Sequence, residues 1–364
     1  MDVRIIATIL ATTVLWSCAA AGQAAPPPLE LIAATAIPQG SRFHGVAVGG
    51  LSGLDRLPGG DYLAISDDKG DGRPPRFYRL AIRIDAPRHR MRVRLKRQVV
   101  LRDAQGMPFP TDRLVVDPEA IRHPGQGHVL WSSEGTWQDD PARRTQPAIV
   151  ESDARGRILH SFALPAAYLY ADNRTRGAES NGVLEGLAVA PDGGVFAINE
   201  VPAFEDRMAA GDGDAPALHR LTRFDPRTRR ATGQYVYAVP DARYAVSELL
   251  AVDDHRFLTI KRATPFDMRH GVDARIVLST IAPGSSDVLA CPAVPRCDAV
   301  PMTRRVLLDL PGHYRGVTID NLEGLAWGPR LADGRRALIA EADDNFSREE
   351  RSQFLAFAWS DPKE

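Results

Sequence analysis

The feature of this 364-residue sequence that most constrains its fold is a segment that recurs five times. In its clearest copy, residues 184–200, an apolar segment leads through a Pro-Asp-Gly-Gly turn into a second apolar segment that ends in Glu200. Apolar segments joined by such a turn are typical of a β-hairpin. Corresponding positions in the five copies lie about 63 to 75 residues apart, at Gly53, Ala120, Gly186, Leu249 and Gly324.

A third strand-like segment follows each hairpin, for example residues 76–80 and 148–152, and several copies add a fourth, such as 157–162. Four short antiparallel strands per repeat is the composition of a propeller blade, and radial closure leaves few sheet edges exposed. The sequence therefore predicts an all-β fold, a β-propeller of five or six four-stranded blades. A sixth blade would have to lie near residues 91–101 or 306–310. A β-sandwich or two separate β domains is the competing architecture.

The N-terminus has the features of a targeting segment. Arg4 precedes an apolar run over residues 5–16, which is too short to span a bilayer but suits a secretory signal. Leu15–Cys18 resembles a lipobox, in which Cys18 would be lipidated; ordinary cleavage near residues 23–25 is the alternative. We therefore expect residues 1–28 to be signal peptide and tether, and residues 29–364 to form one propeller domain. The protein would be periplasmic or an outer-membrane lipoprotein, or else secreted.

The net charge limits the classes of binding partner, and the cysteines predict a disulfide. With 45 basic and 46 acidic residues the net charge is −1, which predicts no nucleic-acid binding and membrane contact only through a lipid anchor. We expect a monomer. Cys291 and Cys297 flank a Pro-rich loop and are expected to form a disulfide in an oxidising compartment.

The repeat also places carboxylates at equivalent positions. Because the first strand of every propeller blade lines the channel, we expect one ring from the first strands and a second from the ends of the second strands. The first ring would hold Ser52, Glu119, Glu185, Glu248 and Glu323, and the second Asp67, Glu134, Glu200, Lys261 and Glu341. Ionised acids this close repel one another, and Ca²⁺ would compensate them. The structural alternative is that each Glu only caps backbone amides of the next blade.

Two loops add further acids. The loop over residues 67–72 contains Asp68, and the loop over residues 341–345 contains Asp343. Oxygen ligands of calcium are commonly found on such turns, although solvated acidic turns are the plain alternative. Lys261, Arg262 and Arg176 are candidates for offsetting acidic charge or holding an anionic substrate. His44, just before the first repeat, is a candidate at the channel mouth.

Residues 90–97 alternate basic and apolar side chains, which predicts a strand with one basic and one apolar face. The basic face would protect an exposed strand from pairing with other chains, with anion binding as the alternative.

The order and content of several short motifs resemble those of a bacterial family described as esterase-like activity of phytase, or phytase-like. The match covers roughly residues 40 to 358 and rests on residues 50–54, 66–68, 117–120, 133–135, 181–187, 199–200 and 320–325. The resemblance implies an exported propeller, related in architecture to calcium-dependent alkaline phytases, and it implies no established substrate. The fourth copy departs from the pattern because Leu249 stands where the others have a small residue.

These observations together predict a Ca²⁺-dependent hydrolase of phosphate or carboxylate esters. We expect catalytic roles for Glu185, Glu200, Glu323, Lys261 and Arg262. The metal ligands would be Asp67, Asp68, Glu119, Glu134, Glu341 and Asp343, and the substrate-binding residues His44, Asn181, Asn321 and Arg176. The alternative is a non-catalytic envelope propeller that binds a ligand or a protein.

Overall fold

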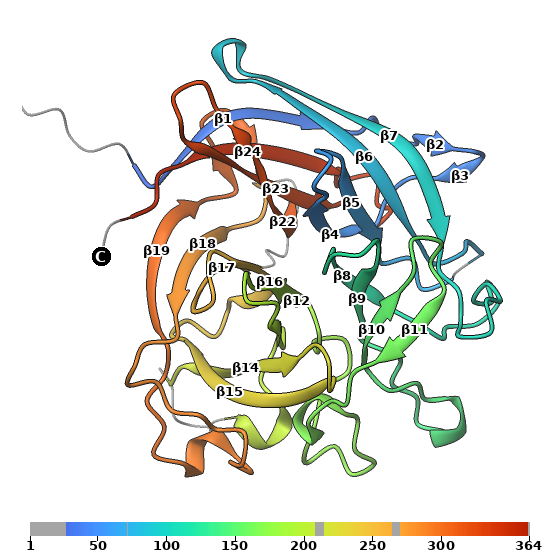
Figure 1. Cartoon of the computed structure of the whole chain (residues 1–364), viewed down its shortest axis with the longest axis vertical. Coiled ribbons are helices and arrows are strands. Elements are labelled where there is room, and N and C mark those ends of the chain that lie inside the picture. The colour runs from blue at the N-terminus through green and yellow to red at the C-terminus, as the bar shows by residue number, and fades with distance from the viewer. Residues whose placement is uncertain (1–26, 71, 208–214, 264–269, 363–364) are drawn as a thin grey trace, which may run out of the picture.

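The computed structural model describes residues 27–70, 72–207, 215–263 and 270–362. It shows five four-stranded antiparallel sheets arranged around a central axis (Figure 1). Blade 1 contains β4 (Leu51–Arg56), β5 (Tyr62–Ser66), β6 (Arg76–Asp85) and β7 (Arg90–Val100); blade 2 contains β8 (Pro118–Arg122), β9 (Val129–Ser133), β10 (Ala148–Ser152) and β11 (Ile158–Ser161). Blade 3 contains β12 (Gly186–Val189), β13 (Val195–Ile198), β14 (Ala217–Asp225) and β15 (Arg230–Val239). Blade 4 contains β16 (Ala245–Ala251), β17 (Arg256–Arg262), β18 (Ala274–Thr280) and β19 (Thr303–Leu310).

Blade 5 joins the two ends of the described chain. Its strands β22 (Asn321–Arg330), β23 (Arg336–Asp343) and β24 (Gln353–Trp359) come from the C-terminal part, and its outer strand β1 (Leu29–Ala36) comes from the N-terminal part. The strands β1 and β24 pair antiparallel, from Leu29 opposite Trp359 to Ala36 opposite Gln353. This pairing completes blade 5. The ring of blades is closed, because each inner strand contacts the inner strands of both neighbouring blades, and β22 contacts β4.

The predicted all-β propeller is thus confirmed, with five blades. The two segments considered for a sixth blade are outer strands: residues 91–101 fall largely in β7, and residues 306–310 in β19. The sandwich alternative is wrong, because the core lies between successive blades rather than between two sheets. Its buried side chains come from inner and middle strands, such as Leu54 with Ala326 and Leu187 with Ala120.

Most inner strands carry a bulge near the start of their hairpin, and this bulge positions the channel residues. The pairing register shifts across Ser52 in β4, Glu323 in β22 and Ser247 in β16, and between Pro118 and Ile121 in β8. The bulged residue in blade 4 is therefore Ser247. Glu248 instead occupies the position held by glycine in blades 1 and 5, which corrects its predicted place in the first ring.

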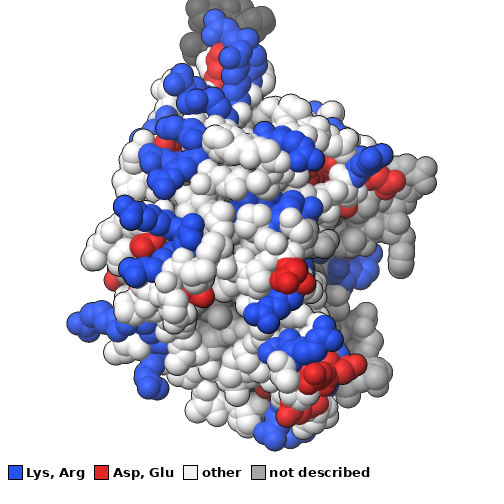
Figure 2. All heavy atoms as spheres, turned by 90° about the vertical axis from the view of Figure 1, so that its right-hand side faces the viewer, with Lys and Arg blue, Asp and Glu red and all other residues white. Residues whose placement is uncertain are grey.

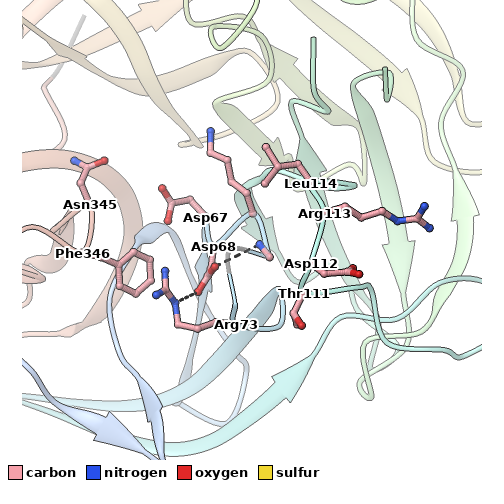
Figure 3. Close-up of a pocket in the computed structure, with 11 residues that line it drawn as sticks. Asp67, Asp68, Arg73, Thr111, Asp112, Arg113, Leu114, Asn345 and Phe346 are labelled. Atoms are coloured by element: carbon pink, nitrogen blue, oxygen red, sulfur yellow. Dashed lines mark hydrogen bonds and ion pairs between the residues drawn. The ribbon is translucent and has the colours of Figure 1, made fainter. Parts of the chain in front are cut away.

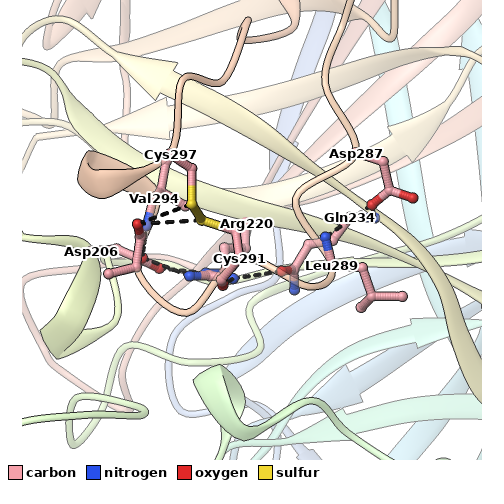
Figure 4. Close-up of a disulfide and its surroundings, with 9 residues drawn as sticks. Asp206, Arg220, Gln234, Asp287, Leu289, Cys291, Val294 and Cys297 are labelled. Carbon is pink, nitrogen blue, oxygen red and sulfur yellow. Dashed lines mark hydrogen bonds and ion pairs between the residues drawn. A yellow bond between two sulfur atoms is a disulfide. The ribbon is translucent and has the colours of Figure 1, made fainter.

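A disulfide joins Cys291 to Cys297, as predicted, with the Cα atoms 6.5 Å apart (Figure 4). The loop that it closes covers a buried ion pair between Arg220 and Asp206. Arg220 Nη1 donates to the Cys291 carbonyl at 3.1 Å, and the Val294 amide donates to Asp206 at 2.8 Å. No helix in the described part of the chain has the length and hydrophobicity needed to cross a membrane. Cys18 lies outside the described residues.

Candidate functional site

Nine acidic side chains gather where the inner two strands of the blades meet at one end of the channel; we call them the acidic cluster. Its members are Asp67, Asp117, Glu119, Glu134, Glu185, Glu200, Glu323, Glu341 and Asp343. The repeat explains the convergence, because equivalent positions in a propeller lie at similar distances from its axis. Strand pairing makes Asp67, Glu134, Glu200, Arg262 and Asp343 the equivalent residues of the five blades, each at or just beyond the end of a second strand.

The first-strand residues meet through Ser52. Its hydroxyl lies 2.8 Å from Oε2 of Glu119 and 3.0 Å from Oε2 of Glu323. A hydroxyl has one proton to donate, so it satisfies one ionised carboxylate at a time. Glu185 is buried, with only 6% of its surface exposed, and yet it makes no hydrogen bond or ion pair with another described residue. The inner end of the channel is therefore rich in acceptors and poor in donors.

Three members of the acidic cluster have the geometry of a cation site. One carboxylate oxygen each from Asp117, Glu119 and Glu134 lies within 4.8 Å of the others, and all three residues are buried. Asp117 Oδ1 and Glu134 Oε2 are buried with no hydrogen-bond partner. An all-carboxylate donor set with orphaned oxygens fits a hard divalent cation such as Ca²⁺.

A second part of the acidic cluster, contributed by blades 1 and 5, also lacks compensation. Glu341 and Asp343 are almost completely buried, and no oxygen of either carboxylate has a hydrogen-bond partner among the described residues. Asp67 Oδ1 is likewise unpaired. Native proteins rarely leave this many buried acceptors unsatisfied, so these groups are further candidates for cation ligands.

The electrostatics follow from burial and mutual repulsion. Burial, together with the charges of Asp117 and Glu200, raises the pKa of Glu134 to about 8. Burial and neighbouring carboxylates raise the pKa of Glu119, Glu185 and Asp343 well above its ordinary value. Without a cation, Glu134 would therefore be largely protonated at neutral pH, and the ionised forms of the other acids are disfavoured.

Two basic side chains offset part of this charge. Arg262 Nη2 lies 2.9 Å from Oε1 of Glu323 and 3.3 Å from Oε1 of Glu200. Lys69, in the loop after β5, places its Nζ 2.6 Å from Oδ2 of Asp117. Sequence reasoning missed Lys69 and Asp117 as residues of this site. Their proximity to predicted acids, Asp67 and Glu119, was the available signal.

The other predicted cation, Lys261, is not at this site. Because side chains alternate along β17, Lys261 points away from the acids that Arg262 contacts. Its ammonium lies 6.0 Å from the centre of the Tyr244 ring, and burial with nearby arginines lowers its pKa to about 8. Its placement does not support the predicted catalytic role.

Glu248 is likewise not a member of the acidic cluster. Its Oε1 pairs with Arg122 Nη2 at 2.6 Å, and its Oε2 accepts from the Leu325 amide at 3.0 Å. Arg122 donates in addition to the Leu54 and Leu249 carbonyls. The pair thus connects the inner strands of blades 1, 2, 4 and 5.

A pocket of about 600 Å³ opens beside Asp67 (Figure 3). Basic and acidic side chains line it, including Lys69, Arg73 and Arg113. Asp68 faces this pocket but is engaged, because its Oδ2 pairs with Arg73 at 2.5 Å and with Arg76 at 2.7 Å. Arg73 stacks on the Phe346 ring at 4.1 Å. Asp68 therefore holds arginines rather than presenting a free metal ligand.

The predicted substrate-binding residues are scattered. Asn181 accepts from Lys69 Nζ at 3.1 Å at the rim, and Asn321 donates to Glu323 at 2.7 Å inside the channel. His44 is exposed in the turn between β2 (Arg42–Phe43) and β3 (Val46–Ala47), against the Phe43 ring. Arg176 is exposed and pairs with no acid among the described residues. The structure brings Asn181 and Asn321 to the site, but not His44 or Arg176.

A family model described as phytase-like, esterase-like activity of phytase, matches residues 46–346. No curated protein matches the sequence. Among solved structures, a GH43 β-1,3-galactosidase with galactodeoxynojirimycin is 10% identical, with 88% of this chain and 93% of that chain covered and a TM-score of 0.45. The PQQ-bound aldose sugar dehydrogenase of Streptomyces coelicolor is 12% identical, with 93% and 100% covered and a TM-score of 0.38. A Dyadobacter fermentans protein of unknown function is 10% identical, with 92% and 100% covered and a TM-score of 0.43. Similarity at this level says nothing about activity.

Proposed function

The chain belongs to the phytase-like family, esterase-like activity of phytase, and from that premise we propose that it is a divalent-cation-dependent hydrolase of phosphate esters. The observation that carries the proposal is the buried group of Asp117, Glu119 and Glu134, with its orphaned oxygens. Ca²⁺ is the proposed cation, because carboxylate oxygens in irregular arrangement suit its flexible coordination.

The proposed ligands are Asp117, Glu119 and Glu134, with Asp67, Glu341 and Asp343 as the second group. Bound there, a cation would neutralise phosphate charge and lower the pKa of a water molecule. The protein side chains do the remaining work. Lys69 would hold the anionic group beside Asp67, at the pocket that Lys69 itself lines.

Glu185 is the proposed catalytic acid–base residue. Its carboxylate makes no hydrogen bond or ion pair with a described residue, and burial with the charges of Glu200 and Glu134 raises its pKa. Because a raised pKa favours the protonated form, such a carboxyl group is suited to protonating a leaving alkoxide. Glu200 and Glu323, both paired with Arg262, would position that arginine near the substrate.

The test is hydrolysis of 4-nitrophenyl phosphate, bis(4-nitrophenyl) phosphate and 4-nitrophenyl acetate by the purified full chain, with Ca²⁺ and with chelator. We expect phosphate-ester hydrolysis to be lost on chelation and restored by Ca²⁺. Glu134→Gln should lower both activity and Ca²⁺ affinity at least about tenfold. Glu151→Gln, which alters a carboxylate in the outer part of blade 2, is the matched control and should change neither.

Activity that survives chelation would reject the cation-dependent mechanism. Stoichiometric Ca²⁺ binding without hydrolysis of any ester would favour the binding propeller over the enzyme. We further propose that the protein is exported and lipidated at Cys18. The substitution Cys18→Ala should then shift the protein from the membrane fraction to the soluble fraction, which cell fractionation measures.

A further inference from the structure

The hairpin of β6 and β7 has two chemically opposite faces. On one face Ile82 lies opposite Val93, and Ile84 opposite Met91; these apolar pairs pack toward the core shared with β1. On the other face the hairpin and its turn present exposed basic side chains. These residues, which we call the arginine face, are Arg83, Arg88, Arg90, Arg92 and Arg94.

The acidic side chains of the described residues balance only part of the charge of the arginine face. Its single acid, Asp85, lies 3.4 Å from Arg88 and 3.2 Å from Arg90. Arg83, Arg92 and Arg94 have no acidic partner among the described residues. Arg83 and Arg92 lie directly opposite each other in the register.

Like charges at directly opposed positions destabilise a strand pair. An edge strand needs only an occasional charge to avoid pairing with other chains, so protection of the edge does not require this opposition. The arrangement is instead complementary to an extended anionic surface that lies outside the molecule. The net charge of −1 conceals this local excess, which Figure 2 shows as blue side chains gathered toward the protruding upper end.

The position of the arginine face indicates which surface it meets. His89, in the hairpin turn, has its Nδ1 3.0 Å from the Ile32 carbonyl of β1. The strand β1 begins at Leu29, and the chain before it leads back to Cys18 and the apolar run over residues 5–16. Fully extended, residues 19–28 reach no more than about 35 Å. The arginine face therefore lies near the point where the chain would leave the propeller toward a membrane.

We propose that the arginine face docks on anionic lipid headgroups and holds the propeller against the membrane to which its N-terminal segment leads. One acyl chain gives only reversible attachment, and a basic patch supplies the second contribution that stable attachment needs. Each arginine near an anionic bilayer contributes about fivefold to binding, and salt screens this contribution. The proposal does not depend on the acidic cluster or on hydrolysis.

The test is flotation of the full chain with vesicles of phosphatidylcholine alone, or of phosphatidylcholine mixed with phosphatidylglycerol. The variant Arg83→Gln/Arg92→Gln removes the opposed pair. The variant Arg304→Gln/Arg305→Gln, on the exposed outer strand β19, is the matched control. Because every variant keeps the same N-terminal segment, differences between them report the arginine face alone.

We expect the wild type and the control to bind mixed vesicles equally and to lose binding as salt rises. The Arg83→Gln/Arg92→Gln variant should bind mixed vesicles about 25-fold more weakly, while its binding to phosphatidylcholine alone stays unchanged. Its melting temperature should not fall, since a repulsion has been removed. Equal binding of this variant and the wild type to mixed vesicles would overturn the proposal. Binding of the wild type to an anionic polysaccharide but to neither kind of vesicle would also overturn it.

Discussion

Arg122 Nη2 lies 2.6 Å from Glu248 Oε1, and this buried ion pair joins blade 2 to blade 4 across the propeller. Arg122 and Glu248 also bond to the backbone of blades 1 and 5 through Leu54 and Leu325. The pair occupies the region where the inner strands approach each other. The buried pair thus ties together the inner strands of blades 1, 2, 4 and 5.

Removing one partner of this ion pair should destabilise the propeller strongly. Glu248→Ala leaves the Arg122 guanidinium buried and uncompensated, so we expect a loss of about 3–5 kcal/mol in the free energy of unfolding, measured by urea titration. Glu30→Ala, which breaks the more exposed pair with Arg335, should cost no more than about 1 kcal/mol. Equal losses in the two variants would contradict a central role for Arg122 and Glu248.

The pH dependence of stability should differ between the chelated and the Ca²⁺-bound protein. The folded-state pKa of Glu134 is raised to about 8 from 4.5, so in this range the folded state binds more protons than the unfolded state. The chelated protein should therefore become less stable as pH rises from about 4.5 to 8. Saturating Ca²⁺, which binds the ionised carboxylates, should cancel or reverse that slope. Thermal unfolding across this range, with and without chelator, measures both curves.

Gly50 should be needed for the position of Asp67. Its φ is +60°, and a Cβ added there would collide with Oδ1 of Asp67. Gly50→Ala should therefore weaken Ca²⁺ binding as well as lower stability, which calorimetric titration and thermal unfolding separate. Gly40→Ala is the matched control, because Gly40 has φ +72° but no atom within 4 Å of the added Cβ. We expect it to cost about 1–2 kcal/mol of stability with unchanged Ca²⁺ affinity.

Arg262 and Lys261 are adjacent, but their removal should have opposite effects. Arg262→Met leaves Glu200 and Glu323 without their cation and should lower stability by several kcal/mol, about 3–5 at most. Lys261→Met removes a buried ammonium that has no acidic partner within 4 Å among the described residues. We therefore expect Lys261→Met to be neutral or stabilising by about 1 kcal/mol. Denaturant midpoints compare the two, and a large loss in Lys261→Met would show an unrecognised role for this lysine.

The disulfide should stabilise the outer part of blades 3 and 4 without affecting the channel. A loop as short as Cys291–Cys297 is expected to contribute roughly 2 kcal/mol. The double variant Cys291→Ser/Cys297→Ser should lose about this much, because the loop also covers Arg220 and Asp206. Calcium affinity should stay unchanged, since the loop contacts none of the acidic cluster. A parallel loss of Ca²⁺ binding would contradict this separation.

Much of the channel could be predicted because a repeat carries positional information. Once five copies are aligned, Glu119, Glu185 and Glu323 must lie at similar radii, whatever the details of the blades. The structure places all three together, with Ser52 between two of them. The all-β class follows from the same pattern, because hairpins joined by tight turns bury their apolar faces only when sheets stack.

The errors arose where one residue of register matters. A bulge at Ser247 moved Glu248 out of the first ring, and strand alternation turned Lys261 away while it turned Arg262 inward. Side chains change face at every residue of a strand, so an alignment that is wrong by one position reverses the outcome. Lys69 and Asp117 were missed because loops lack such a period.

The sequence by itself determined the repeat, the hairpins, the disulfide and the set of acids that one axis would collect, because each depends on local pattern or on repetition. Only the tertiary structure decided that five blades suffice, that β1 completes blade 5, and that Arg122 reaches Glu248 from another blade. These features depend on contacts between segments far apart in the chain. Their geometry is set by how the blades pack around the axis, which no local pattern encodes.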